Sequence, residues 1–292
     1  MNSVPGPEAA DFEANRPRLV RLAYRMLGSL AEAEDVAQDA WLRWRGVDRQ
    51  QVADPSAWLV RTATRLCLDR LRAEKTRREA YRGPWLPEPL IEDLATDPLE
   101  RAEEVSVAFL LALERLSPLE RAVFLLHDVF DADFAAVAET LGRSEAACRQ
   151  LAVRARDHVR DTRPRFSVGQ EEAARLAIAF MDAARNNDLD GLRSLLAEDA
   201  VLITDGGGKR SAALRPMIGR DDILALFKGL QWRSNWLASP TVRLVRVNGY
   251  LGAILDTEGG PITVAFQPGD AGRLAAIYMV VNPEKLTRLG AG

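Results

Sequence analysis

Apolar residues recur every three to four positions through the first half of the chain, the spacing of amphipathic helices. The clearest case is a set of three short helices between residues 117 and 163. Ser117 begins the first with a capping box and proline at the first helical position, and this helix is expected to run to about Val129. Asp133–Leu141 is the second helix, and Ser144 caps the third. The apolar face of the third helix comprises Cys148, Leu151, Ala152, Ala155 and Val159.

The polar face of this third helix predicts DNA binding. Its first turns carry side chains placed where a recognition helix meets base edges, and arginines flank them as phosphate contacts would. Arg149 is expected to donate two hydrogen bonds to guanine and Gln150 to pair with adenine. The expected DNA contacts are Arg143, Ser144, Glu145, Ala146, Arg149, Gln150, Arg154 and Arg156, with Arg160 as a further flanking cation.

A second group of helices precedes this unit. Ser29–Glu32 is another capping box, and Asp54-Pro55 begins a long helix that carries a basic run to Arg82. On the first of these helices Asp35, Gln38 and Asp39 recur after one turn and form one polar row. The apolar residues that follow that capping box at helical spacing are Val36, Ala37, Ala40, Trp41 and Trp44.

After Ser167 the periodicity changes from helices to alternating strands. Helices are expected at 170–185, 189–196 and 223–230, with a strand near 200–204 between the second and third. Alternating segments then predict an antiparallel meander, because Asn248-Gly249 and Glu258-Gly259-Gly260 supply tight turns. The pattern predicts an α+β cone with a small interior cavity. The expected strands of the meander are Val242–Val247, Leu251–Leu255, Ile262–Phe266 and Ala275–Val281.

Composition and charge narrow the function. The 292 residues suffice for two or three domains, and the net charge of −3 argues against indiscriminate nucleic-acid binding, so DNA is expected to be reached within a larger assembly. The sequence offers neither a membrane span nor a signal sequence, and Cys67 and Cys148 lie on apolar helix faces. We therefore expect a cytoplasmic protein with buried thiols and without a cofactor or metal.

The expected organisation has four parts. A helical domain covers residues 10–83, and an acidic, proline-rich linker covers 84–106. The helix-turn-helix domain covers 107–164, and the cone covers 168–292.

The first three parts resemble sigma factors of the extracytoplasmic-function (ECF) class. Ala33–Trp41 resembles the helix with which those factors bind the clamp helices of bacterial RNA polymerase, and Trp58–Arg72 resembles their segment for the promoter minus-ten element. Residues 116–156 resemble their minus-thirty-five reader. The resemblance implies polymerase contacts at Asp35, Gln38, Asp39 and Trp41. It implies minus-ten contacts at Trp58, Arg61, Arg65, Arg70, Arg72 and Lys75, although the family commonly has Asn at the position of Arg65.

The remainder resembles the SnoaL-like branch of the NTF2-like fold. Three strings place the combination in the sigma-J-like subgroup: Trp85-Leu86-Pro87-Glu88-Pro89, Asp205-Gly206-Gly207-Gly208-Lys209 and Asn282-Pro283-Glu284-Lys285-Leu286. The resemblance implies an RNA polymerase sigma factor whose own cone modulates its activity. We expect the first two strings to lie near one another, with the third on the same side.

Two alternatives stay open. One is a helix-turn-helix regulator that binds operator DNA without polymerase and senses a small ligand in the cone. The other is an enzyme, because related cones include polyketide cyclases and isomerases. The enzyme hypothesis lacks an acid–base pair, since His127 and His158 lie outside the cone and its carboxylates Asp199, Asp205 and Asp256 have no clear partner.

Overall fold

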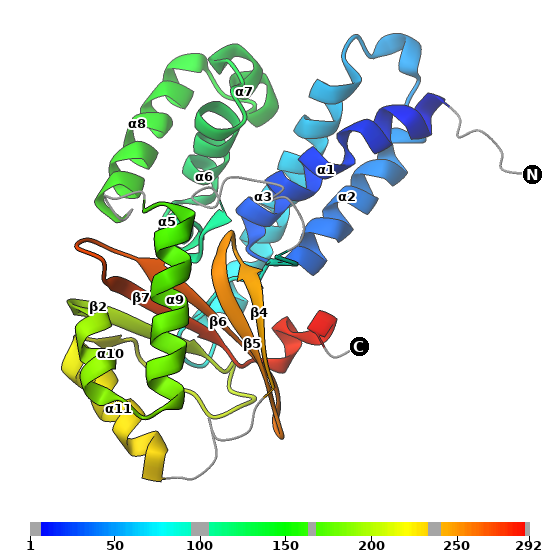
Figure 1. The fold of residues 1–292 in the computed structure, drawn as a ribbon. Coiled ribbons are helices and arrows are strands. Elements are labelled where there is room, and N and C mark those ends of the chain that lie inside the picture. The colour runs from blue at the N-terminus through cyan, green and yellow to red at the C-terminus, as the bar shows by residue number, and fades with distance from the viewer. Residues whose placement is uncertain (1–6, 95–104, 163–167, 233–240, 290–292) are drawn as a thin grey trace, which may run out of the picture. The chain divides into compact units, whose positions relative to one another are not determined.

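The computed structural model describes residues 7–94, 105–162, 168–232 and 241–289 (Figure 1). The chain forms two compact units that are discontinuous in sequence. The first unit comprises residues 1–79 and 112–163, and the second comprises 80–111 and 164–292. The predicted fold class, helical domains followed by an α+β cone, is confirmed. Residues 80–94 and 105–111, expected as the end of the first helical domain, the linker and the start of the next domain, belong to the same compact unit as the cone.

The first unit is helical. Its apolar rows close on a shared core in which Leu19, Trp44 and Leu59 are fully buried. The helices are α1 (Pro7–Leu27), α2 (Leu30–Trp44), α3 (Pro55–Glu79), α6 (Pro118–Phe124), α7 (Phe134–Leu141) and α8 (Glu145–Thr162), with α5 (Val107–Glu114) crossing the boundary between the units.

Capping explains where these helices begin and end. The Ser117 hydroxyl accepts from the Glu120 amide while the Glu120 carboxylate accepts from Ser117, so the predicted capping box is present. Asp133 caps α7, and Gly142 ends it at a left-handed φ of 61°. The stretch expected as one helix from Ser117 to Val129 continues beyond Phe124 as a π-helical turn, residues 125–129.

The second unit is a seven-stranded sheet with helices packed on one face. The strand order is β1-β4-β5-β6-β7-β2-β3, antiparallel except for the parallel pair of β2 and β7. The helices are α9 (Gln170–Arg185), α10 (Leu189–Leu195) and α11 (Arg220–Trp232). The strands are β1 (Ile91–Glu92), β2 (Leu196–Asp205), β3 (Met217–Ile218), β4 (Thr241–Val247), β5 (Tyr250–Thr257), β6 (Gly260–Pro268) and β7 (Leu274–Val280).

Several expected boundaries are wrong. The helix expected to reach Arg82 ends at Glu79, and the chain turns at Gly83 with a φ of 87°. The strand near 200–204 starts at Leu196, where pairing with β7 is irregular up to Val201. The pattern also missed β1 and β3, because two-residue strands carry no readable alternation.

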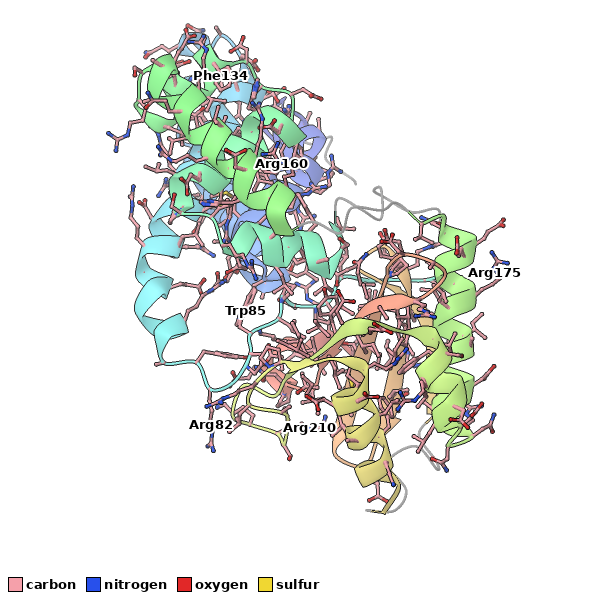
Figure 2. All side chains as sticks on the ribbon, turned by 90° about the vertical axis from the view of Figure 1, so that its left-hand side faces the viewer. Arg82, Trp85, Phe134, Arg160, Arg175 and Arg210 are labelled. Carbon is pink, nitrogen blue, oxygen red and sulfur yellow. The ribbon has the colours of Figure 1, made fainter. Side chains whose placement is uncertain are left out.

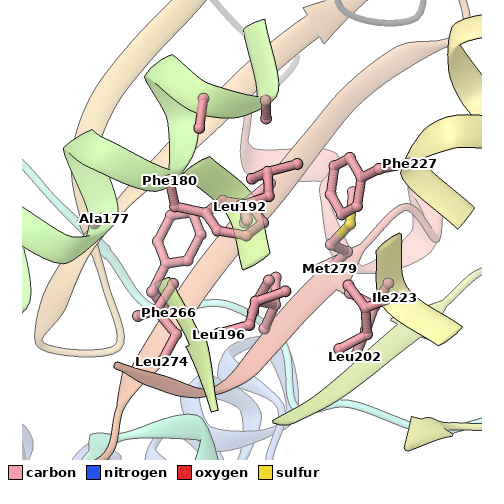
Figure 3. Packing of buried hydrophobic residues seen from close by; sticks show 14 of the residues in the cluster. Ala177, Phe180, Leu192, Leu196, Leu202, Ile223, Phe227, Phe266, Leu274 and Met279 are labelled. Atoms are coloured by element: carbon pink, nitrogen blue, oxygen red, sulfur yellow. The ribbon is translucent and has the colours of Figure 1, made fainter. Parts of the chain in front are cut away.

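The two faces of the sheet bury different things. One face packs under α9, α10 and α11 around Phe180, Phe227 and Phe266 (Figure 3). The other face packs against Leu86 of the linker and Leu286 near the C-terminus. The sheet therefore separates the hydrophobic core of the cone from the surface on which the linker packs.

Both cysteines are buried and free, and burial raises the pKa of the Cys67 thiol. Within the described residues, no helix is long and apolar enough to cross a membrane. The described His, Cys, Asp and Glu side chains form no cluster of three suited to a metal ion.

The capping box predicts a measurable stability effect. Ser117→Ala removes the oxygen that satisfies the Glu120 amide, and we expect a loss of about 1 kcal/mol in the free energy of unfolding. Denaturant titration followed by circular dichroism measures it. Ser211→Ala, at an exposed position outside regular structure, is the matched control. Equal unfolding curves for the two variants would contradict the role of the cap.

Candidate nucleic-acid interface and linker latch

The recognition helix α8 presents the expected surface. Its predicted base-contact positions Glu145, Ala146, Arg149 and Gln150 are exposed, as are the flanking arginines. The Arg149 guanidinium pairs with the Glu145 carboxylate and lies 5.3 Å from the ring centre of Phe134. Phe134 is the first residue of α7 (Figure 2). An exposed pair of this kind contributes little to stability and separates readily when a guanine edge competes for the guanidinium.

The flanking arginines are held by acids of the same unit. Arg154 donates to Glu120 at 2.9 Å, and Arg156 donates to Asp128 at 2.6 Å. Burial would raise the pKa of Glu120, but hydrogen bonds from Ser117 and Arg154 outweigh it and lower that pKa. The remaining expected contacts, Arg143, Ser144 and Arg160, are exposed at the surface of the unit.

The polar row of α2 lies on one face, as predicted. Asp35 and Gln38 are exposed, and the side chain of Asp39 is 45% exposed although it accepts from Arg70 at 2.9 Å. Trp41 is half-buried, with its ring centre 5.0 Å from that of Phe12. The pattern missed Leu42, which is 55% exposed and follows Asp39 and Gln38 on this face.

Two of the arginines expected at the minus-ten element, Arg61 and Arg65, lie against α7. Arg61 pairs with Glu139 at 2.5 Å, and the Arg65 Nε–H donates to the Thr140 carbonyl at 3.2 Å. Arg65, the departure from the family's Asn, therefore joins the two helical parts of the first unit. No local pattern predicts this contact, because Arg65 and Thr140 are 75 residues apart in the chain.

The other minus-ten positions are placed less tightly. Trp58 is half-buried, with its ring centre 5.3 Å from that of Trp44. Arg72 is exposed and pairs with Asp69. Arg70, also on α3, instead pairs with Asp39 in the acidic row of α2. Lys75 lies in α3, but its side chain is outside the described residues.

A buried carboxylate organises the second unit. Asp205, at the end of β2, is fully buried. The Tyr81 hydroxyl donates to its Oδ1 at 2.6 Å, and the Leu86 amide donates to its Oδ2 at 2.8 Å. Burial, followed by the hydrogen bond to Asp205, raises the pKa of Tyr81, which keeps the phenol protonated as a donor.

Lys285 brings the three strings together. Its Nζ donates to Asp205 Oδ2 at 2.7 Å and to the Leu86 carbonyl. The same ammonium lies 4.3 Å from the ring centre of Trp85, a cation–π distance (Figure 2). The expected proximity of the three strings is confirmed. We call Tyr81, Trp85, Leu86, Asp205, Asn282 and Lys285 the latch.

The glycines of the second string make room for this contact. Gly207 has a φ of 57°, and a Cβ there would clash with the side-chain amide of Asn282. The Asn282 amide donates to the Tyr81 hydroxyl at 2.9 Å. Lys209 faces solvent instead and pairs with Glu284 at 3.1 Å.

A second clamp, formed by the side chain of Asn248, holds two further residues of the linker, Leu90 and Val105. Asn248 accepts from the Leu90 amide at 3.3 Å through its side-chain carbonyl and donates to the Val105 carbonyl at 2.9 Å through its amide. β1 adds to the sheet by pairing with β4, and Glu88 pairs with Arg288 at 3.6 Å. The sequence indicated only the tight turn at Asn248, since nothing local reveals a partner about 150 residues away.

The carboxylates considered for catalysis lie elsewhere than an acid–base site. Asp199 is exposed, and Asp256 is exposed and pairs with Arg243 at 3.4 Å. Asp205 is part of the latch. The described contacts of these three carboxylates are with solvent, with Arg243 and with the latch, so they do not support the enzyme hypothesis.

Comparison with known proteins identifies the chain. Residues 12–77 match the family model Sigma-70 region 2, and residues 106–159 match Sigma-70, region 4. The chain is 41% identical to the ECF RNA polymerase sigma factor SigJ of Mycobacterium tuberculosis, across 96% of this chain and 93% of that protein. This chain belongs to the ECF RNA polymerase sigma factors.

A further relative and a solved structure agree. The chain is 37% identical to the probable ECF RNA polymerase sigma factor SigI of Mycobacterium tuberculosis, covering 98% of this chain and 97% of that one. The crystal structure of Mycobacterium tuberculosis SigJ superposes with a TM-score of 0.79 at 39% identity, covering 96% and 98% of the two chains. Because these matches extend through the cone, the whole architecture is that of this sigma factor type.

The two classes of arginine on α8 of this sigma factor predict different effects. Arg149→Ala should cost about 1–3 kcal/mol at one base position of the minus-thirty-five element and relax preference there. Arg156→Ala should weaken all promoters alike and flatten the salt dependence of binding. Binding of polymerase holoenzyme to a set of single-base promoter variants measures both. A promoter profile identical to the parent for Arg149→Ala would remove Arg149 from base contact.

The acidic row of α2 predicts loss of polymerase binding on charge reversal. Asp39→Arg should weaken binding to the polymerase core at least tenfold, because it replaces a negative charge of the proposed binding row with a positive one. The new cation also lies beside Arg70, which pairs with Asp39 in the parent. Glu13→Arg, an exposed reversal on α1, is the matched control. Titration of labelled protein with core polymerase measures the affinity, and equal affinities for the two variants would contradict the assignment.

Proposed function

We propose that this sigma factor directs polymerase to its promoters and that its cone, through the latch, limits when the two DNA-binding parts can separate. The observation that carries the proposal is Lys285, which contacts all the strings that hold the linker on the cone. The expected role of the cone was regulatory, and the latch supplies a physical means for it.

Separation is required by geometry. In the first unit Arg65 of region 2 lies 3.2 Å from Thr140 of region 4. The minus-ten and minus-thirty-five elements are about 25 base pairs apart, roughly 85 Å at 3.4 Å per base pair. One chain cannot keep the Arg65–Thr140 contact and bind both elements, so promoter binding must open the first unit.

The linker decides how far that opening can go. Residues 80–111 join region 2 to region 4 along the chain, and fully extended they would span at most about 110 Å. While Leu86 is buried and Asn248 holds both Leu90 and Val105, that length is not available. Release of the latch and of the Asn248 clamp together therefore lengthens the reach between the two DNA-binding parts.

The exposed surfaces supply the contacts of the open form. We assign the α2 row of Asp35, Gln38 and Asp39 to the polymerase core, with Leu42 as an apolar addition. α8 supplies the minus-thirty-five contacts, and Arg61 and Arg65 become available to minus-ten bases when α7 moves away.

The cone has a regulatory and not a catalytic role in this proposal. Its carboxylates are committed to the latch or to the surface, which favours a binding domain over a cyclase or isomerase. The acidic row of α2 and the arginines of α3 have no use in a regulator that acts without polymerase. We place the activity in the bacterial cytoplasm, where polymerase works.

Breaking the latch should raise transcription. Lys285→Met keeps the length of the side chain but removes the cation from Asp205, Trp85 and the Leu86 carbonyl. We expect a rise of at least threefold in transcription from a cognate promoter at limiting core polymerase. In vitro transcription with the full-length chain measures it.

The control for this experiment is Lys228→Met, which removes an exposed lysine of α11 outside the latch. Tyr81→Phe is a second, gentler test, because it removes only the hydroxyl that donates to Asp205. It should move transcription in the same direction as Lys285→Met. If both latch variants transcribe like Lys228→Met, the cone does not act through the latch.

A further inference from the structure

The Arg149 guanidinium has two partners in the free protein, and they contact different parts of the group. Glu145, one turn earlier on α8, accepts a hydrogen bond from its Nη2. The ring of Phe134 lies under the guanidinium carbon, with 5.3 Å between that carbon and the ring centre, which is a cation–π distance. The Arg149 side chain therefore reaches from α8 back to the first residue of α7.

Of these two partners, Glu145 competes with DNA and Phe134 does not. A guanidinium contacts an aromatic ring through its face, whereas it donates to guanine through N–H groups that lie in its plane. The Glu145 carboxylate occupies such an N–H group and must leave when a base takes it. The Phe134 ring leaves the N–H groups free, so its contact with Arg149 is compatible with the promoter complex.

The Phe134 ring is itself held in place. Its ring centre lies 3.9 Å from that of His127, and the two ring planes are inclined by 32°. His127 Nδ1 lies 2.7 Å from the Ala132 carbonyl, and because a carbonyl can only accept, this nitrogen carries a hydrogen and donates. His127, Phe134 and Arg149 thus form one stack, which joins the π-helical turn at 125–129 to α7 and α8.

The stack lies within one DNA-binding part. All three of its residues fall in residues 106–159, the stretch that matches Sigma-70, region 4. The ring contacts and the His127 hydrogen bond involve region 4 alone, so the stack stays together when the first unit opens. Whatever orientation it gives to Arg149 is therefore present when α8 meets the promoter.

We propose that Phe134 is a positioning residue for the minus-thirty-five element, because its ring holds the Arg149 guanidinium in the orientation in which Arg149 contacts a base. The Arg149 side chain is 56% exposed, and ordering a long exposed side chain on DNA costs conformational entropy. A guanidinium that the ring already orients loses less of this entropy. Phe134 thus acts on base preference through Arg149, and the inference rests on the base contact of Arg149 in the proposed function.

The test measures the binding of polymerase holoenzyme to a set of single-base promoter variants. Arg149→Ala identifies the base position that depends on Arg149. Phe134→Leu keeps an apolar side chain but removes the ring, and it should reduce the preference at that same position at least threefold while the other positions stay as in the parent. Phe134→Tyr, the conservative variant, keeps the face of the ring and should retain the preference of the parent.

A double variant separates positioning from packing. In the Arg149→Ala background, Phe134→Leu should change the preference at this position no further, because the side chain through which the ring acts is missing. A role of Phe134 in packing alone would weaken all promoters alike, with or without Arg149. Phe134→Met removes the ring in a second way, and unfolding midpoints show which variants are folded.

The outcomes distinguish this inference from the function on which it rests. Parent-like preference in a folded Phe134→Leu or Phe134→Met protein, beside a relaxed position in Arg149→Ala, would overturn the positioning role alone. Equal losses at all positions would overturn it as well. If Arg149→Ala itself keeps the profile of the parent, the base contact of the proposed function is wrong, and the positioning role falls with it.

Discussion

The carboxylate of Asp205 is a charge with no exposure to water, and the arrangement of the second unit follows from the need to compensate it. A buried charge is stable only when it is paired and hydrogen-bonded. The donors are Tyr81, Leu86, Gly207 and Lys285. Tyr81 and Leu86 belong to residues 80–111, which join region 2 to region 4, so this segment completes the hydrogen bonding of the charge. When the linker separates from the cone, water can replace its hydrogen-bond donors to Asp205. The latch can therefore open and close reversibly.

This reversibility suits a protein that must exist in two forms. The closed first unit, with Arg65 against α7, cannot span a promoter, and the linker must lengthen before it can. A device built on buried ionic and hydrogen-bonded contacts favours one geometry without greatly increasing stability. In the cone, β7 faces the core under α9, α10 and α11 on one side and the linker on the other.

Sequence patterns captured the local structure because its causes are local. The capping box at Ser117, the stop at Gly142 and the turn at Asn248 each depend on a few neighbouring residues, and all are present. The proximity of the three strings was predicted from the resemblance to the sigma-J-like subgroup, and not from the local sequence pattern. The contact of Arg65 with Thr140 and the clamp by Asn248 were missed, because each joins segments that are distant in the chain. Leu42 was missed although its spacing from Gln38 and Asp39 places it on the same face of α2.

A distance measured across the latch tests most directly whether the latch opens when the sigma factor binds a promoter. Arg82 and Ser211 are exposed and line one shallow pocket of the second unit, and the two native cysteines are buried, so Arg82→Cys and Ser211→Cys can be spin-labelled selectively. If promoter binding opens the latch, the free protein shows one short distance, and the promoter-bound polymerase complex shows a longer, broader distribution. The same short distance in a transcribing complex would contradict it.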